Sequence, residues 1–396
     1  MSSTFQRNVS PVERLFTIFS ETDPPFCNQL ILEGTGVIDK PLWEKAIAEA
    51  CEANPSSRVV YQGRSVWAKW VDTGVPAPLR FVDGSNWSGF NSDGALFFND
   101  PLPFKTSHSA EVVVVNGCDS PQRVILRTLH ATMDGGGTWN WAHDIFRALR
   151  KEPLEGWLDP INDQEFLKSL KLQPAKPEKK IKCLTATGQP DKTQETGFIW
   201  NRVRLEGKFS KLLSQLTIAV AKEARKQGPG NVRIGVPLEL RRRIPDTRSS
   251  SNLTRRIYLD VEPDDTIESI TKQLIAKLEN LNDDPKGSNT FGYIPSFWLK
   301  SLYLSSLKRG RETGNYKDSG TISNGGLLPL DELHGGGFVT ESFFWIPTVI
   351  ETKPFFMSTV GYGNILEVVT AMPKIHGSNG RLDTFSSNII AELKSK

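Results

Sequence analysis

Short apolar runs alternate with segments of helical period through the first part of the chain. Runs rich in valine, isoleucine and leucine between turn-forming residues predict strands, and two of them read as a hairpin around Gly63. Ser10, Pro11 and Glu13 are typical of a helix start, because serine caps and proline fits the first turn. The expected strands are 27–34, 58–62, 65–71, 110–117 and 122–130, and the other expected helices are 41–55 and 138–150.

Apolar positions three or four apart predict which helix faces are buried. For the helix over 41–55 the predicted face is Leu42, Ala46, Ile47 and Ala50; for that over 138–150 it is Trp141, Ile145, Phe146 and Leu149. Core packing is expected for most of the tryptophans at 139, 141, 298 and 345.

The second half of the chain alternates in the same way. Its expected strands are 231–240, 255–263, 321–327, 341–349, 355–363 and 365–372, and its expected helices are 207–228, 266–281 and 381–394. In the helix over 266–281 the predicted buried face is Ile267, Ile270, Leu274, Leu278 and Leu281. Strands and helices are mixed in both halves, which indicates an α/β or mixed α+β fold.

One segment breaks the alternation. Residues 171–195 are rich in lysine, proline and threonine and poor in large apolar side chains, which is typical of a linker. The chain has 396 residues. One core seldom serves more than roughly 300 residues. The sequence therefore predicts an N-terminal lobe over 1–170, a crossover linker over 171–195 and a C-terminal lobe over 196–396.

Composition narrows the class of protein. Apolar residues make up 38% of the chain, which supplies a core and argues against disorder. The formal charge is only +3, from 48 basic and 45 acidic residues, so a nucleic-acid binder is not expected. We expect no signal peptide, and no segment reaches the roughly 20 apolar residues that a membrane-spanning helix needs. The four cysteines are far apart in sequence, which favours free thiols, and a cytoplasmic protein without a membrane partner is expected.

His130, at the end of a predicted strand, is the first candidate for chemistry. A histidine can take a proton from an attacking group, because its ordinary pKa lies near neutrality. Asp134 either orients the imidazole or forms a buried ion pair that shapes the loop. Gly135, Gly136 and Gly137 allow positive φ and the close approach of another chain or a ligand. Their amides, just before a helix, are placed to donate to a developing oxyanion.

Three other groups of residues in the sequence could carry chemistry. A metal site at His130, Asp134, His143 and Asp144 is disfavoured, because the glycines break any shared helical face and converging ligands are needed. The His334–Gly337 segment resembles an esterase oxyanion motif, but the chain lacks the G-x-S-x-G sequence that would accompany it. A basic cluster is either a solvated strand edge or a contact for phosphate groups or an acidic protein surface. That cluster is Arg241, Arg242, Arg243, Arg248, Arg255 and Arg256.

The segment from His130 to Gly135 resembles the HxxxDG motif of the condensation-domain superfamily. That group includes nonribosomal-peptide condensation domains, polyketide-associated and alcohol acyltransferases and chloramphenicol acetyltransferase. Four further segments resemble the family in the expected order: SPVERLF at 10–16, GVPLELRRR with SSNLTRRIYLDV, TISNGG at 321–326, and the strands over 355–373. The resemblance covers nearly the whole chain.

This resemblance implies two chloramphenicol-acetyltransferase-like lobes in a V, with a tunnel between them and no bound cofactor or metal. His130 would be the catalytic base, and Asp134 would form a structural ion pair with Arg241, or failing that with Arg243. Gly135 would lend its amide near the acyl carbonyl, beside Gly136. From the second lobe, Ser323 and Asn324 would line the tunnel.

The chain departs from the family in two places. Leu129 stands where peptide-forming condensation domains carry a second histidine, and Gly361–Gly363 is only a loose counterpart of the plant-type DFGWG segment. The resemblance therefore implies a stand-alone acyltransferase in secondary metabolism. It would move an acyl group from a phosphopantetheine thioester, either coenzyme A or a carrier protein, to a hydroxyl or amine. The alternatives are a free-standing peptide-forming condensation enzyme and a catalytically silent binding relative.

Overall fold

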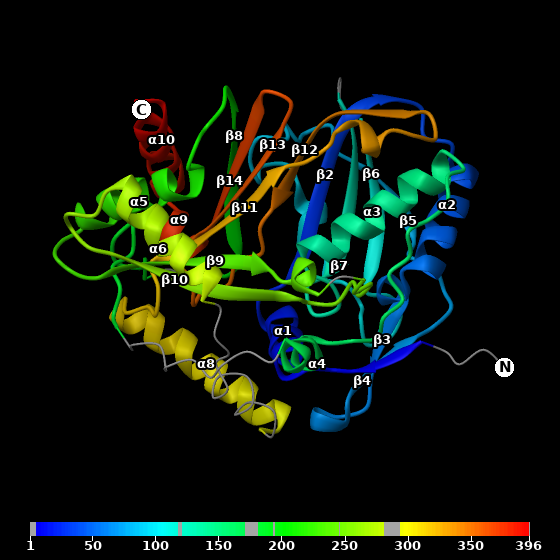
Figure 1. Cartoon of the computed structure of the whole chain (residues 1–396), viewed down its shortest axis with the longest axis horizontal. Helices are drawn as coiled ribbons and strands as arrows, with labels where there is room; N and C mark the ends of the chain where they lie inside the picture. Colours follow the sequence, from blue (N-terminus) through cyan, green and yellow to red (C-terminus); the bar gives the residue numbers. More distant parts are fainter. Residues whose placement is uncertain are drawn as a thin grey trace.

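The computed structural model describes residues 5–117, 121–170, 181–192, 195–244, 246–280 and 294–395. Two mixed sheets stand side by side, each covered by helices on its outer face (Figure 1). This confirms the mixed α/β class. None of the helices in these ranges is both long and apolar enough to cross a membrane.

The first sheet has five strands in the order β12-β2-β7-β6-β5. These are β2 (Cys27–Gly36), β5 (Leu79–Asp83), β6 (Ala110–Asn116), β7 (Gln122–Leu129) and β12 (Phe338–Ile346). Helices α2 (Lys40–Ala53) and α3 (Gly135–Leu149) bury one face of this sheet in a shared core. The predicted face of α3 is confirmed. In α2 the prediction of Leu42 is wrong: Leu42 is exposed, and Trp43 is buried beside Phe146 and Phe338.

The second sheet has six strands in the order β10-β9-β11-β13-β14-β8. These are β8 (Phe198–Glu206), β9 (Val232–Glu239), β10 (Thr254–Val261), β11 (Gly320–Leu327), β13 (Phe356–Tyr362) and β14 (Ile365–Pro373). Helices α5 (Leu212–Arg225), α6 (Ile267–Glu279) and α10 (Arg381–Lys394) pack on it. The short α9 (Lys374–Gly377) follows β14. Of the predicted α6 face, Ile270 is buried, Ile267, Leu274 and Leu278 are half-buried, and Leu281 lies outside the described residues.

Further helices and a small sheet lie outside these two layers. The sheet, in the order β1-β4-β3, consists of β1 (Gln6–Asn8), β3 (Val59–Gln62) and β4 (Lys69–Asp72). The helices are α1 (Pro11–Thr22), α4 (Asp163–Ser169) and α8 (Ser296–Thr313). Ser10 caps α1 in a capping box with Glu13, as predicted. The pattern did not predict α4 or α8, and Trp298 on α8 is 55% exposed rather than in a core.

The two halves of the sequence are interlocked. Strand β12, from the second half, pairs with β2 of the first sheet from Gly36 to Gln29. One apolar cluster joins both sheets and includes Ile125, Phe344 and Trp200. Within the predicted linker, residues 171–180 lie outside the described residues. The backbone of Cys183 forms isolated β-bridges with Asn231 and Tyr316.

A buried ion network also joins the sheets. Arg202 of β8 pairs with Glu33 of β2 and Glu367 of β14, each at 2.8 Å, and its side chain is fully buried. Its guanidinium carbon also lies 3.8 Å from the centre of the Phe344 ring of β12. Burying these charges is tolerable because each has a close, hydrogen-bonded partner. The network fixes the two sheets against each other.

Candidate active site

The candidate site forms where β7 ends and α3 begins. Strand β7 stops at Leu129, His130 follows, and Asp134 caps α3 by accepting a hydrogen bond from the amide of Gly137 at 2.9 Å. The three glycines form the first turn of the helix and none has positive φ, so that part of the expectation is wrong. The expected close approach is present instead. A Cβ on Gly137 would lie 2.1 Å from the Ser250 carbonyl oxygen.

Arg241, not Arg243, is the arginine that reaches Asp134. Its Nη2 lies 2.8 Å from Asp134 Oδ1, and Asp134 and Arg241 are only 1% and 7% exposed. Asp134 Oδ2 also accepts hydrogen bonds from the Leu253 amide at 2.9 Å and the Thr254 hydroxyl at 2.8 Å. Residues 240–253 connect β9 and β10, and Figure 1 shows this end of the strand pair beside α3. The Asp134 carboxylate therefore ties the β9–β10 connection to the start of α3.

Electrostatics explain why Asp134 stays charged. Burial alone would raise the pKa of this carboxyl, but the charge and hydrogen bonds of Arg241, together with the hydrogen bonds from Gly137 and Thr254, hold the pKa below the ordinary value. Glu239 binds the same guanidinium at 2.6 Å. Burial, and then the negative charge of Asp134, raise the pKa of Glu239. Gly136 backs onto this group, since a Cβ there would lie 2.3 Å from Glu239 Oε2.

His130 is held by one side chain at two points. Asn252 donates its amide N–H to the His130 carbonyl oxygen, which leaves Asn252 Oδ1 facing His130 Nδ1 at 3.0 Å. An amide oxygen only accepts, so Nδ1 must carry the proton. Nε2 is then the unprotonated nitrogen. This is the tautomer that a general base requires.

The surroundings of His130 keep the ring neutral. The ring is half-buried, stacked on Phe26 at 5.4 Å between ring centres and tilted against Phe16 at 4.9 Å. Burial lowers the pKa of His130 below its ordinary value, against smaller opposing contributions that include Asp134 and Asn252. The imidazole is therefore mainly unprotonated at neutral pH, because its pKa lies below 6.5.

Asn252 is the site residue that sequence reasoning missed. It lies 122 positions from His130, so no local spacing joins the two. The available signal was its place in the SSNLTRRIYLDV segment already matched to the family. The position of Asn252 also depends on the Asp134–Arg241 pair. Arg241 donates hydrogen bonds to the Ser249 and Ser251 carbonyls and so sets the path of residues 249–254.

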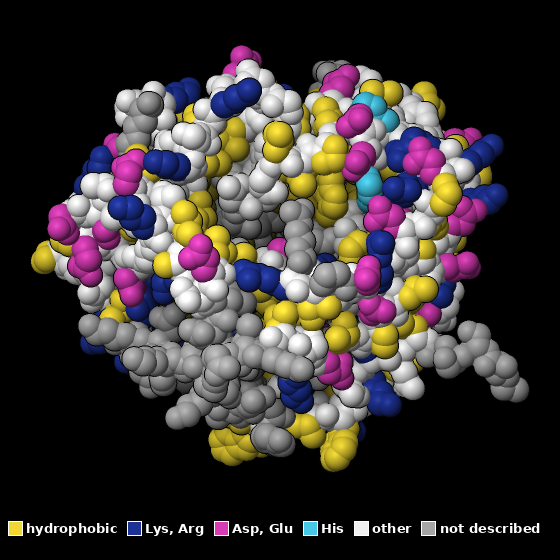
Figure 2. All heavy atoms as spheres, in the orientation of Figure 1, with side chains coloured by type: hydrophobic (Ala, Val, Ile, Leu, Met, Phe, Trp, Pro, Cys, Tyr) yellow, Lys and Arg dark blue, Asp and Glu magenta, His cyan; other side chains and the backbone are white. Residues whose placement is uncertain are grey.

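The remaining predicted site residues lie in different surroundings. Gly135 has open space around it, since a Cβ would meet no atom within 4 Å. Ser323 is half-buried and Asn324 exposed on β11, where Asn324 Oδ1 accepts from Thr359 and Gly326. No hydrogen bond in the described structure connects Ser323 or Asn324 to His130. Figure 2 shows a hollow between the two sheets with hydrophobic side chains on both sides.

The possible metal ligands, the His334–Gly337 segment and the arginine cluster do not form a second functional site among the described residues. In the described ranges no three His, Cys, Asp or Glu side chains gather as a metal site would require. His143 faces Glu332 at 2.6 Å, while Asp144 is fully buried and accepts a hydrogen bond from Asn54. His334 contacts the Thr340 carbonyl within a glycine turn. Of the arginine cluster, Arg241 is buried while Arg248 and Arg256 are exposed.

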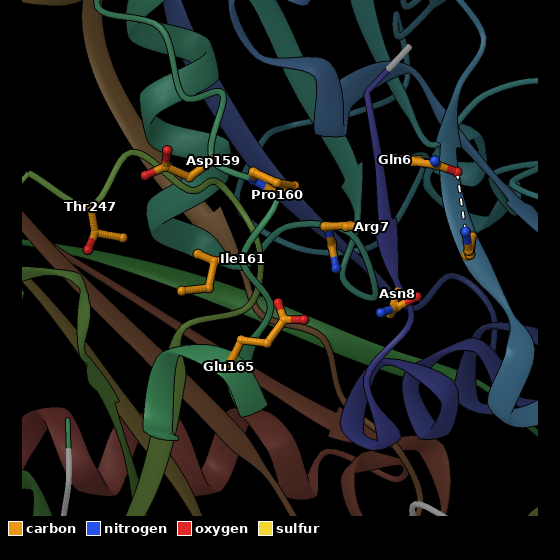
Figure 3. Close-up of a pocket in the computed structure, with 9 residues that line it drawn as sticks. Gln6, Arg7, Asn8, Asp159, Pro160, Ile161, Glu165 and Thr247 are labelled. Carbon is orange, nitrogen blue, oxygen red and sulfur yellow. Dashed lines mark hydrogen bonds between the residues drawn. The ribbon is translucent and has the colours of Figure 1, made fainter. Parts of the chain in front are cut away.

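Described residues also line two cavities, of which the first lies beside this region. A polar cavity of about 580 Å³ lies between β1, residues 159–165 and Thr247 (Figure 3). Arg7 lines it and donates to the Thr132 carbonyl at 2.9 Å, so the cavity backs onto the His130–Asp134 loop. A cavity of about 590 Å³, lined mainly by apolar residues, lies between residues 327–334 and the β13–β14 turn.

Comparison with known proteins identifies the fold of this chain. No protein-family model and no curated protein sequence matches the chain. Among solved structures, the starter condensation domain of rhizomide synthetase RzmA, in complex with C8-CoA, is similar over 99% of this chain and 94% of its own. The TM-score is 0.67 at 12% identity. A second complex of that domain, with C8-CoA and Leu-SNAC, gives a TM-score of 0.66 at 14% identity over 98% of this chain and 94% of that one.

A third structure comes from a different assembly. The condensation domain of the monacolin K polyketide synthase MokA aligns with 98% of this chain and 97% of its own, with a TM-score of 0.65 at 10% identity. The similarity thus spans both sheets and the connection between them, as the resemblance of the HxxxDG segment led us to expect. The chain has the fold of the condensation-domain superfamily.

Proposed function

We propose that this chain is an acyltransferase that moves an acyl group from a phosphopantetheine thioester to a hydroxyl or amine. The observation that carries the proposal is the orientation and neutral state of the His130 imidazole. Asn252 holds it in the tautomer with a free Nε2, and its lowered pKa keeps it neutral. A neutral, oriented imidazole at the end of a strand is suited to take the proton of an attacking nucleophile.

The reaction follows from these groups. The acceptor oxygen or nitrogen attacks the thioester carbonyl while His130 Nε2 takes its proton. The tetrahedral oxyanion then collapses, the carbon–sulfur bond breaks, and the imidazolium returns the proton to the leaving thiolate. An ester or amide and a free thiol result, so the thioester supplies the activation and no metal or cofactor enters the reaction.

The first turn of α3 is the proposed oxyanion site. The first amides of a helix have no partner within the helix, and Asp134 satisfies that of Gly137. The N–H groups of Gly135 and Gly136 remain for a ligand, and the space around Gly135 is open. The positive end of the helix dipole adds to their effect on a developing negative charge.

The donor and acceptor are tested by thiol release, followed with a thiol-reactive dye. Acyl-coenzyme A and acylated carrier protein, each with a pool of alcohols or of amines, give four combinations. We expect acceptor-dependent release in at least one of them. Preference for carrier protein with amines would identify the amide-forming alternative, which the RzmA complex with Leu-SNAC makes the natural second candidate. No release in any combination would contradict acyl transfer.

The role of Asn252 is tested through the pH dependence of kcat/KM. Activity should rise through a pKa below 6.5 as His130 loses its proton. In Asn252→Asp a carboxylate replaces the amide oxygen beside Nδ1. It should raise the pKa of His130 and move this rise to higher pH, because a nearby negative charge favours the imidazolium.

A matched control separates this effect from a general change of charge. Asn280→Asp, on the exposed end of α6, should leave the profile in place. An Asn252→Asp profile that coincides with the wild type would show that Asn252 does not set the state of the ring.

A further inference from the structure

Helix α8 and the turn between β3 and β4 expose an unusual set of side chains. Trp67 is 83% exposed, Phe297 66% and Trp298 55%, whereas many other aromatic rings of the described chain are buried. We call this surface the α8–turn patch; it comprises Val66, Trp67, Phe297, Trp298, Leu302 and Leu304.

The two segments of the patch are neighbours. Arg14 of α1 donates to the Ser65 hydroxyl in the turn and to the carbonyl of Ile294, two residues before α8. Both segments lie at the lower edge of the molecule, where hydrophobic side chains also appear at the surface (Figures 1 and 2). The patch is therefore one surface built from two distant parts of the sequence.

Packing fixes which face of α8 points outward. Leu299 and Tyr303 are buried against Phe19 and Ile18 of α1. At about 3.6 residues per turn, Phe297, Trp298 and Leu304 fall on the outward half of the helix, and Leu302 falls on its flank. Because the buried side anchors the helix, the exposed rings are held outward, and a patch of this kind exceeds the scattered single residues of an ordinary surface.

Cationic side chains surround the patch. Arg64 lies in the turn, and Lys308 and Arg309 lie on the outward half of α8; all three are exposed. Lys105 and Lys300 share one acidic partner, Glu21. The only acidic side chain on α8 is Glu312, beside Lys308 at 3.9 Å. The surface thus combines tryptophan and phenylalanine with an excess of positive charge.

We propose that the α8–turn patch binds the surface of an anionic phospholipid membrane. Tryptophan is suited to the membrane interface, since its ring is mostly apolar and its N–H remains in the wet headgroup layer. Lysine and arginine beside such rings are attracted to anionic headgroups. A second copy of this chain would bring two basic rims together, which like-charge repulsion opposes.

This proposal departs from the expectation of no membrane partner, which rested on the absence of a spanning segment. The patch lies one helix away from the candidate site, since α1 contacts both α8 and, through Phe16, the ring of His130. The membrane proposal does not depend on acyl transfer. It stands or falls on binding alone.

The test is co-sedimentation of the full chain with two kinds of vesicle, phosphatidylcholine alone and phosphatidylcholine mixed with phosphatidylserine, in a buffer of physiological ionic strength. We expect binding to the anionic vesicles only. Trp67→Ser with Trp298→Ser should weaken it by roughly tenfold or more. Lys308→Gln with Arg309→Gln should weaken it by about 25-fold, or about fivefold for each cation.

Two controls use residues outside the patch. Leu96→Ser with Leu158→Ser removes two other exposed apolar side chains, and Lys40→Gln with Lys45→Gln removes two cations from α2; both pairs should bind as the wild type does. The proposal is overturned if the wild type does not bind anionic vesicles, or if the patch variants bind as tightly as the controls. It is also overturned if vesicle binding is absent and sedimentation velocity shows a dimer that the tryptophan substitutions dissociate, because a second copy would then cover the patch.

Discussion

Replacing His130 with alanine is expected to lower kcat/KM for acyl transfer by about 10²- to 10⁴-fold, the range that a positioned general base contributes. The variant keeps the open helix end at Gly135 and the space for both substrates, so it loses the proton acceptor rather than the binding site. Substrate KM should change much less than kcat. Steady-state kinetics at neutral pH, with the best donor and acceptor from the thiol-release panel, measure both.

The control for this prediction is His108→Ala. His108 is half-buried, and its ring nitrogen pairs with the neighbouring Ser107 hydroxyl. We expect its kcat/KM to match that of the wild type. Circular dichroism and thermal unfolding should show that His130→Ala is folded, because Asn252 still holds the backbone carbonyl at position 130. A folded His130→Ala enzyme with wild-type activity would contradict the proposed base.

Removing either member of the Asp134–Arg241 pair is expected to lower the free energy of unfolding by about 3 to 5 kcal/mol. In Asp134→Ala, the amides of Gly137 and Leu253 and the hydroxyl of Thr254 lose their shared acceptor inside the protein. In Arg241→Ala, Asp134 and Glu239 face each other without a cation, so this variant should be the less stable of the two. Urea unfolding followed by fluorescence measures both values.

The comparison arginine is Arg243. It is exposed and donates to the Leu278 carbonyl, so Arg243→Ala should change the free energy of unfolding by less than about 0.5 kcal/mol. The pH dependence adds a second readout. Since folding lowers the pKa of Asp134, its stabilisation is present above the unfolded value of 3.8 and is lost as pH falls through the folded pKa. Asp134→Asn should lose this pH dependence of stability. Wild-type stability of both Asp134→Ala and Arg241→Ala at neutral pH would show that the buried ion pair does not stabilise the fold.

Most strands and helices were predictable because their periodicity is local. The capped start of α1 and the buried face of α3 follow from spacings within one helix. The Leu42 error shows where spacing fails: Leu42 and Trp43 are adjacent, and only the approach of Phe146 and Phe338 selects the tryptophan. Helix α8 was missed because much of its apolar surface is exposed, so no clear amphipathic pattern marks it.

The candidate site was predictable only in part, because half of it comes from a distant segment. His130, Asp134 and the glycines form one readable motif, and the family resemblance directed attention to the 241–243 arginines. The hold of Asn252 on His130 depends on how residues 249–254 cross to α3, which the arginine's bonds to backbone carbonyls determine. Contacts of this kind, from one side chain to a remote backbone, leave no periodic trace in the sequence.

Mass spectrometry of the acceptor tests the central claim most directly. Wild type and His130→Ala are incubated with the preferred thioester and acceptor, and acylated product is counted against free thiol. We expect one acylated acceptor for each thiol released by the wild type, and about 100-fold less of both, or lower still, with His130→Ala. Thiol released without acylated acceptor would indicate hydrolysis instead of transfer, and equal product from both proteins would show that His130 is not the base.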